Sequence, residues 1–173
     1  MAESYDIALV RVDNRLVHGQ ILESWVPFIH AKCIMVVNDS SAGDFFCETV
    51  IRMAVPSEIE VNICSIEDFA ANFAFTVGDG KKTIVLFASI ADAYRAYLAG
   101  FQFNKLNIGN IHHEEYAVCC APSVFLCDDE ISDIVSMLET KGVEIELKRV
   151  PREKAVDIKD ALKEYCDIKN QVR

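Results

Sequence analysis

The chain has 173 residues, of which 51% are hydrophobic, and its 27 acidic residues outnumber 17 basic ones, giving a net charge of −10. This apolar content excludes a mainly disordered chain, and the length allows one compact domain or two small ones. The acidic balance argues against a sequence-blind nucleic-acid binder and against docking on an anionic membrane, because both need clustered basic side chains.

Cysteine usage and the absence of an export signal predict a cytoplasmic protein. No segment has the roughly 18 consecutive apolar residues of a membrane-spanning helix, and residues 1–6 lack the basic start of a secretory signal. The seven cysteines cannot all pair within one chain, and cytoplasmic thiols stay reduced. Cys33, Cys47 and Cys64 lie in apolar surroundings, so we interpret them as small core residues.

Apolar runs of strand length recur along the chain. They cover residues 5–12, 33–38, 59–64, 83–88, 105–108, 123–126 and 143–150. A run such as 34–37, which is apolar throughout, is typical of a strand covered on both faces. The run 144–148 alternates in polarity, which predicts a half-exposed strand at the edge of a sheet.

Amphipathic segments of helical length separate these runs. They follow His18 and also cover residues 42–54, 65–73, 89–98 and 128–141, and a terminal helix of about a dozen residues follows Pro151. Pro27 is expected to bend or end the first helix. Short connections between alternating strands and helices favour parallel pairing through right-handed crossovers. The sequence therefore predicts one α/β domain over residues 1–173, with an open, mostly parallel sheet of about seven strands and helices on both faces.

Ligands of open α/β sheets bind beyond the carboxyl ends of the strands. The turn after the first strand is the richest candidate, with two arginines, an aspartate and a histidine between residues 11 and 20. His18 would start the next helix, where backbone N–H groups favour an anion, and Arg15 supplies donors suited to phosphate oxygens. Gly19 leaves room for a bulky group. A neutral imidazole is a nucleophile near neutral pH, so this arrangement suggests a histidine that becomes phosphorylated.

The same residues also permit a plainer interpretation. His18 could be a hydrogen-bonding loop residue, and Arg11 with Asp13 could form a structural ion pair. On the residues alone, both interpretations stay open.

The motif resembles the active-site signature of the IIB component of the mannose/fructose/sorbose family of the bacterial phosphotransferase system. Further similarities occur in order along residues 7–151. The matching segments are residues 11–20 with Trp25, then 34–39, 54–56, 107–109 and 142–145. The first motif is long and chemically unusual, which makes the resemblance specific.

The resemblance implies a phosphohistidine carrier with no cofactor and no metal. A partner IIA protein would phosphorylate His18 on ring Nδ1, with Nε2 protonated, and the group would pass to a sugar imported by membrane IIC and IID subunits. Arg15, and less firmly Arg11, would steady the phosphoryl oxygens and face acids on the IIA protein. Asp13 would order the loop by accepting hydrogen bonds, and the role of Gln20 is open.

The chain also departs from the family pattern. Asn110 stands where a second glycine is common, residues 111–116 contain an acidic patch where relatives often have basic residues, and residues 56–58 lack the usual glycine. These departures concern partner docking and sugar specificity. They leave room for a protein of another class, a regulatory phosphohistidine protein that signals to partners without transporting sugar.

Several other polar residues follow strands and could line the pocket. Asn14, Gly19 and Gln20 belong to the motif, while Asp39, Ser89 and Asn107 follow the second, fourth and fifth runs. The second run is expected to lie beside the first, which would place Asp39 next to His18, although Asp39 could equally cap a helix. For Ser89, capping is favoured over lining the pocket. The Asn107 amide could bond a neighbouring loop or the phosphoryl group. His112, His113, Cys119, Cys120 and Cys127 lack metal-ligand spacing, so no metal site is predicted. Homo-oligomerisation is left open.

Overall fold

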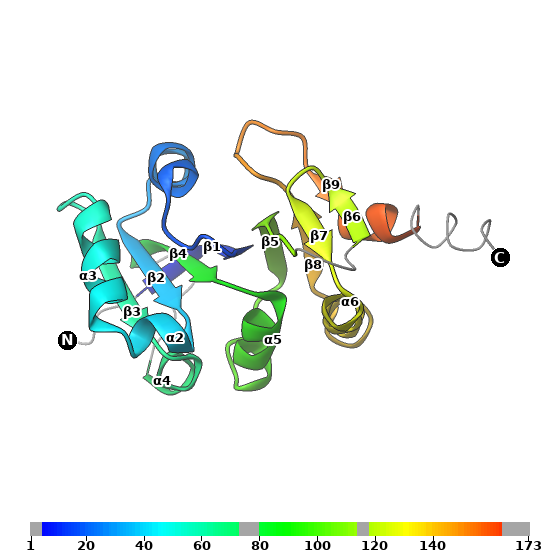
Figure 1. The fold of residues 1–173 in the computed structure, drawn as a ribbon, viewed down its shortest axis with the longest axis horizontal. Helices are drawn as coiled ribbons and strands as arrows, with labels where there is room; N and C mark the ends of the chain where they lie inside the picture. The colour runs from blue at the N-terminus through cyan, green and yellow to red at the C-terminus, as the bar shows by residue number, and fades with distance from the viewer. Residues whose placement is uncertain (1–4, 73–79, 114–117, 164–173) are drawn as a thin grey trace.

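Seven strands form the main sheet in the order β3-β2-β4-β1-β5-β8-β9 (Figure 1). The computed structural model describes residues 5–72, 80–113 and 118–163. Every pairing is parallel except that of β8 with β9, which is antiparallel. This confirms the predicted α/β class and the mostly parallel sheet. The strands are β1 (Tyr5–Asp13), β2 (Cys33–Val37), β3 (Glu60–Cys64), β4 (Lys81–Phe87), β5 (Lys105–Asn110), β8 (Glu144–Leu147) and β9 (Val156–Asp157).

The membership of the sheet differs from the prediction at its β9 edge. The run 123–126 forms β7 (Val124–Leu126), which pairs with β6 (Val118–Ala121) in a separate two-stranded sheet. The two-residue strand β9 takes the seventh place. Because β9 pairs with Glu146 and Leu147, β8 is not the edge strand that its alternating pattern predicted. Alternation reports only that one face is covered, and Ile145 and Leu147 are indeed buried.

Helices form where amphipathic segments were predicted, with two local differences. The helix expected at 42–54 starts three residues later, as α3 (Phe45–Ala54), because the Asp44 carboxylate accepts the Phe46 and Cys47 N–H groups. The preceding residues form a separate short helix, α2 (Asp39–Ala42). Pro27 does not end the first helix, because it occupies the first turn of α1, where its missing N–H is not needed. The helical segments are η1 (Ile21–Trp25, a π-helical turn), α1 (Val26–Ile29), α2 (Asp39–Ala42), α3 (Phe45–Ala54), α4 (Ile66–Asn72), α5 (Ile90–Leu98), α6 (Asp128–Val135) and η2 (Ser136–Thr140, also π-helical).

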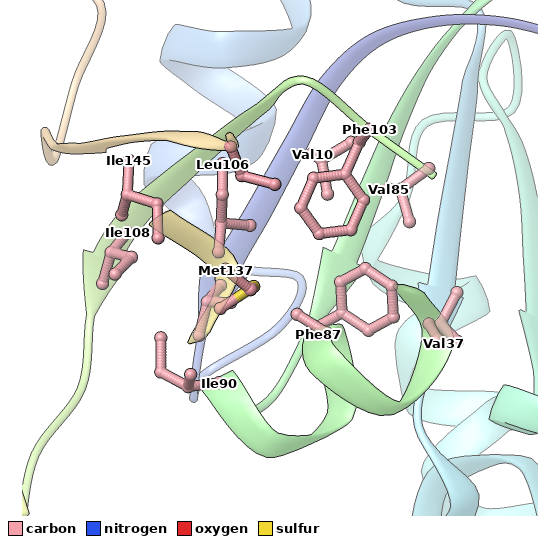
Figure 2. Close-up of a cluster of buried hydrophobic side chains, with 14 of the residues drawn as sticks. Val10, Val37, Val85, Phe87, Ile90, Phe103, Leu106, Ile108, Met137 and Ile145 are labelled. Atoms are coloured by element: carbon pink, nitrogen blue, oxygen red, sulfur yellow. The ribbon is translucent and has the colours of Figure 1, made fainter. Parts of the chain in front are cut away.

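Helices cover both faces of the sheet, as predicted. Figure 1 shows the helix that contains η1 and α1 above the sheet, with α4, α5 and α6 below it. Neighbouring residues of β2 divide between the faces: Met35 and Val37 belong to one buried cluster, Ile34 and Val36 to the other. In Figure 2, Val37, Val85 and Phe87 of the first cluster lie with side chains from β5 and α5.

Within the described ranges, no helix combines the length and apolar character that crossing a bilayer requires. Residues 158–163 are helical, and the rest of the expected terminal helix lies outside the described residues, as do residues 114–116 of the acidic segment. The carboxyl ends of β4, β1 and β5 lie side by side, because Val12 pairs with both Phe87 and Ile108. The loop that follows β1 therefore starts in the middle of the sheet.

Candidate functional site

Arg11 lies beneath this loop and is completely buried. Its guanidinium donates through Nη1 to the Asn107 side chain and to the Lys148 carbonyl, the latter at 2.8 Å. Through Nη2 it donates to Asp13 at 2.9 Å and to the Arg149 carbonyl at 3.1 Å. Burial lowers the pKa of Arg11, and the neighbouring Asp13 carboxylate opposes that shift. Four acceptors thus compensate one buried positive charge.

The guanidinium lies between Trp25 and the glycine backbone of β5. Its Cζ lies 5.3 Å from the centre of the Trp25 ring, and the indole N–H donates to the Arg149 carbonyl at 3.0 Å. A Cβ on Gly109 would lie 1.7 Å from Arg11 Nη2, so only glycine leaves space for this guanidinium. Trp25 itself is buried, which places its ring inside the fold.

The Asp13 carboxylate joins the buried arginine to the loop. Besides the Arg11 bond, it accepts the Arg15 backbone N–H at 3.2 Å, Nε at 3.1 Å and Nη2 at 3.2 Å. These are the hydrogen bonds predicted for Asp13 from both arginines and the backbone. Two guanidinium groups hold this side chain, which is itself completely buried, in one orientation.

Arg15 is the exposed member of the pair. Its side chain is 42% exposed, and its Nη2 also donates to Gln20 Oε1 at 3.1 Å. The Gln20 side chain, whose role the sequence left open, thus contacts Arg15. Among the described residues, Arg15 Nη1 has no hydrogen-bond partner, so it stays available to an incoming anion.

His18 lies where the next helix starts. Its carbonyl accepts the Ile21 and Leu22 N–H groups at 2.9 and 3.1 Å, as predicted for a helix start. The ring is 16% exposed. Its Nδ1 lies 2.9 Å from the Leu16 carbonyl, which can only accept, so this contact places a proton on Nδ1.

The other ring nitrogen also points inward. His18 Nε2 is buried without a hydrogen-bond partner, 3.6 Å from Asp13 Oδ2. Leu16 has a φ of 54°, a conformation rare for a branched residue, which turns the loop sharply before His18. In this conformation the ring is ordered by the loop, and Nδ1 must leave the Leu16 carbonyl before it can act as a nucleophile.

The contact of Arg11 with the phosphoryl group that the resemblance implies is wrong in this structure, and of the two interpretations left open for Asn107 the structure favours bonds to neighbouring protein groups. Arg11 cannot face acids on a partner, because its guanidinium is buried and bonded to internal acceptors. Asn107 lies inside β5 instead of at its end, and its buried amide bonds Arg11 and Glu146, the latter at 3.2 Å. Both residues support the site from below.

The place expected for Asp39 beside His18 rested on β2 adjoining β1, and this premise is wrong because β4 lies between them. The Asp39 carboxylate accepts the Ile66 N–H and bonds Arg95, both at 3.0 Å, and the Ile66 hydrogen bond lowers its pKa. Ser89 caps α5 through the Asp92 N–H at 3.1 Å. That confirms the capping interpretation, and its part in the pocket stays a prediction.

The remaining motif residues lie around the loop. The Asn14 N–H donates to the Asn110 carbonyl at 3.0 Å, and the Asn110 amide donates to Asn14 Oδ1 at 2.5 Å. The departure at Asn110 therefore adds a side-chain contact to the motif. Around Gly19, a Cβ would meet no atom within 4 Å, which agrees with the predicted open space.

His113, Cys127 and Glu130 are the described side chains that come close enough to share a metal ion. Their contacts do not need one. Glu130 Oε2 bonds His113 Nε2 at 2.8 Å and accepts the Cys127 backbone N–H at 3.0 Å. The absence of a metal stays a prediction.

The three cysteines predicted to be core residues pack in or against the buried clusters. Cys33 is fully buried, whereas Cys47 and Cys64 are partly buried and pack against the two clusters. Burial raises the pKa of Cys33 to about 11 and that of Cys64 to about 12, which keeps both thiols protonated and unreactive near neutral pH.

Sequence reasoning missed the supporting groups contributed by the segment after β8. The carbonyls of Lys148 and Arg149 hold Arg11, and Glu153 holds Arg149. A sequence does not show which main-chain carbonyls accept hydrogen bonds. The Arg149–Glu153 pair, four residues apart, was the one available signal.

The chain is similar in sequence and in fold to known proteins. Residues 7–172 match the family model described as PTS system sorbose subfamily IIB component. The chain is 29% identical to the PTS system fructose-specific EIIB component of Bacillus subtilis, covering 91% of this chain and 96% of the relative. It is 30% identical to the N-acetylgalactosamine-specific phosphotransferase enzyme IIB component 2 of Escherichia coli, covering 88% and 96%. The crystal structure of the IIBSor domain of the sorbose permease from Klebsiella pneumoniae superposes with a TM-score of 0.81 at 28% identity, covering 92% and 97%.

Proposed function

Because the chain belongs to the sorbose subfamily of phosphotransferase system IIB components, we propose that His18 carries the phosphoryl group that this family transfers. In this proposal a IIA protein phosphorylates His18, and the group then passes to a sugar imported by membrane IIC and IID subunits. The relatives' names differ in sugar, so the proposal leaves the sugar open. Because the phosphoryl group in this proposal comes originally from phosphoenolpyruvate, the proposal places the protein in the cytoplasm.

One observation supports the proposal most directly: Asp13 connects Arg15 and His18 at a helix start. Asp13 fixes the Arg15 guanidinium through Nε and Nη2 while Nη1 stays free. Gly19 leaves open space next to the histidine. A phosphoryl group on His18 would meet a fixed cation and the first N–H groups of a helix. Positioning and charge are what phosphoryl transfer requires of a protein.

The ring conformation adds a step to the mechanism. The Nδ1–H bond to the Leu16 carbonyl must break, Nδ1 gives its proton to solvent while Nε2 takes one up, and Nδ1 turns outward. The Nδ1 lone pair then forms the new P–N bond as the donor histidine's P–N bond breaks. Nε2 now carries the single ring proton, and the Asp13 carboxylate, which lies 3.6 Å from Nε2 in the present ring orientation, stabilises the positive charge that the ring gains. The donor ring leaves neutral, provided its other nitrogen is protonated. No cofactor takes part in this sequence.

The test supplies phosphoenolpyruvate, the general transfer proteins and a IIA protein, and follows acid-labile, base-stable phosphate on the chain. We expect His18→Ala to abolish this label. His112→Ala is the matched control, because His112 is exposed and its ring packs in a T-shaped arrangement with that of Phe125. Label that persists in His18→Ala would refute the assignment.

A further inference from the structure

We propose that Glu153 is a positioning residue for phosphoryl transfer, which acts by fixing the main chain of Arg149. The Arg149 carbonyl in turn anchors Arg11 and Trp25 beneath the His18 loop. This inference rests on the proposed function of His18, and it assigns Glu153 no contact with the phosphoryl group.

Both carboxylate oxygens of Glu153 bind the same residue. Oε2 accepts the Arg149 backbone N–H at 2.8 Å, while Oε1 accepts Nε at 3.0 Å and Nη2 at 2.7 Å. The Glu153 N–H donates to the Val150 carbonyl at 3.1 Å and closes the turn. One side chain thus fixes both the backbone and the side chain of Arg149.

The segment needs such a fixed point, because it lies beyond the sheet. Strand β8 ends at Leu147, and the Lys148 N–H makes the last ladder-like bond, to the Ile108 carbonyl at 3.0 Å. The Lys148 carbonyl accepts Arg11 Nη1 at 2.8 Å. The carbonyl of Arg149, one residue further from the sheet, accepts two hydrogen bonds, from Arg11 Nη2 at 3.1 Å and from Trp25 at 3.0 Å. Among the described residues, no strand pairing fixes the main chain at Arg149. Glu153 is therefore what holds that carbonyl in place.

A displacement of the Arg149 carbonyl would reach the loop through two side chains. Arg11 Nη2 bonds both that carbonyl and Asp13, so the guanidinium follows the carbonyl and the carboxylate follows the guanidinium. Asp13 orients Arg15 and faces His18 Nε2. The Glu153 charge also favours the ionised form of the buried Arg11.

If the Arg149–Glu153 pair had a purely structural role, its removal would change the stability of the fold only slightly. The Arg149 and Glu153 side chains are 47% and 28% exposed, and ion pairs this exposed add little to stability. A positioning role instead predicts changes in the site that exceed the change in stability.

The experiment compares Glu153→Ala with Glu48→Ala, which removes the acid of another partly exposed Arg–Glu pair four residues apart, on α3. Trp25 is the one tryptophan of the chain, so its emission reports directly on the Arg149 carbonyl contact. We expect Glu153→Ala to shift that emission, to shift the ¹⁵N resonances of His18, and to slow phosphorylation by a phosphorylated IIA protein about tenfold, within the hundredfold that a misplacement of roughly 1 Å can cost. Glu48→Ala should change none of the three.

Arg149→Ala separates the main-chain contact from the ion pair, because it keeps the backbone N–H that Glu153 binds. Its Trp25 and His18 spectra should stay close to those of the unmodified chain. Unchanged spectra in Glu153→Ala, or equal spectral shifts in Arg149→Ala, would overturn the proposal. If Glu153→Ala unfolds, Glu153→Gln, which keeps one acceptor, replaces it with smaller shifts expected. The spectra need no partner, so a failure of His18 phosphorylation would be seen separately from a failure of this inference.

Discussion

Gly109→Ala tests whether the buried guanidinium is the foundation of the loop. The added methyl would lie 1.7 Å from Arg11 Nη2, 2.0 Å from Cζ and 2.4 Å from Nη1. Carbon contacts need about 3.5–4.0 Å, so either the guanidinium or the β5 backbone must move by more than 1 Å or so. A displaced guanidinium would lose its bonds to Asn107 and Asp13.

The expected loss follows from what that displacement leaves behind. A buried ion pair that loses one partner typically costs about 3–5 kcal/mol, because the other charge stays buried without compensation. Against a total unfolding free energy of about 5–15 kcal/mol, this is a large fraction. With a denaturant slope of about 2 kcal/mol per molar urea, the unfolding midpoint of Gly109→Ala should fall by roughly 2 M.

Urea unfolding followed by Trp25 emission measures this directly, since Trp25 packs on the Arg11 guanidinium. Gly19→Ala is the matched control for stability, because its methyl meets no atom within 4 Å. Its unfolding free energy should stay within about 1 kcal/mol of the original, the size of a glycine-to-alanine difference in a helix. If Gly109→Ala also stays within that margin, the guanidinium is not held against the β5 backbone as described.

Two further changes test other parts of the site. Arg15→Ala should slow phosphorylation of His18 by roughly 10- to 150-fold, since a charge-assisted hydrogen bond contributes about 1.5–3 kcal/mol, while far-UV circular dichroism stays the same; an unchanged rate would remove Arg15 from the mechanism. Hydrogen bonds from Arg149 lower the pKa of Glu153 from its usual 4.5, so the contribution of Glu153 to stability is complete above pH 4.5 and is lost as pH falls through the lower folded value. Trp25 emission should therefore stay constant from neutral pH to about 4.5 and change only below that pH. A transition in emission above about pH 4.5 that disappears in Glu153→Ala would contradict this prediction.

Much of the fold could be predicted because each strand and helix carries its own pattern. The apolar run 34–37 divides between two buried clusters, as a strand covered on both faces must. The partners of β7 could not be predicted in this way, since three apolar residues fit a hairpin as well as a sheet. The order of the strands in the sheet could not be predicted either. The expected position of Asp39 beside His18 was wrong because it assumed that β2 lies next to β1.

Within the site, the sequence predicted which residues come together but not their depth. The motif places Arg11, Asp13, Arg15 and His18 within eight positions, which guarantees that they are neighbours. Burial depends on tertiary partners. One of the partners that enclose Arg11 is the carbonyl of Arg149, 138 positions away in the sequence. A buried and an exposed arginine look the same in a sequence.

The buried Arg11 guanidinium offsets the negative charge of Asp13 close to His18. Asp13 lies close to His18, and a lone carboxylate there would repel an incoming phosphoryl group. Arg11 from below and Arg15 from above both pair with that carboxylate, so the three side chains together carry one net positive charge. Because Arg11 and Asp13 are sealed from water, the excess charge belongs to Arg15, the member that faces solvent. In the proposed function, the buried arginine thereby leaves the exposed one free for the phosphoryl oxygens, and Asp13 can orient Arg15 without cancelling its charge.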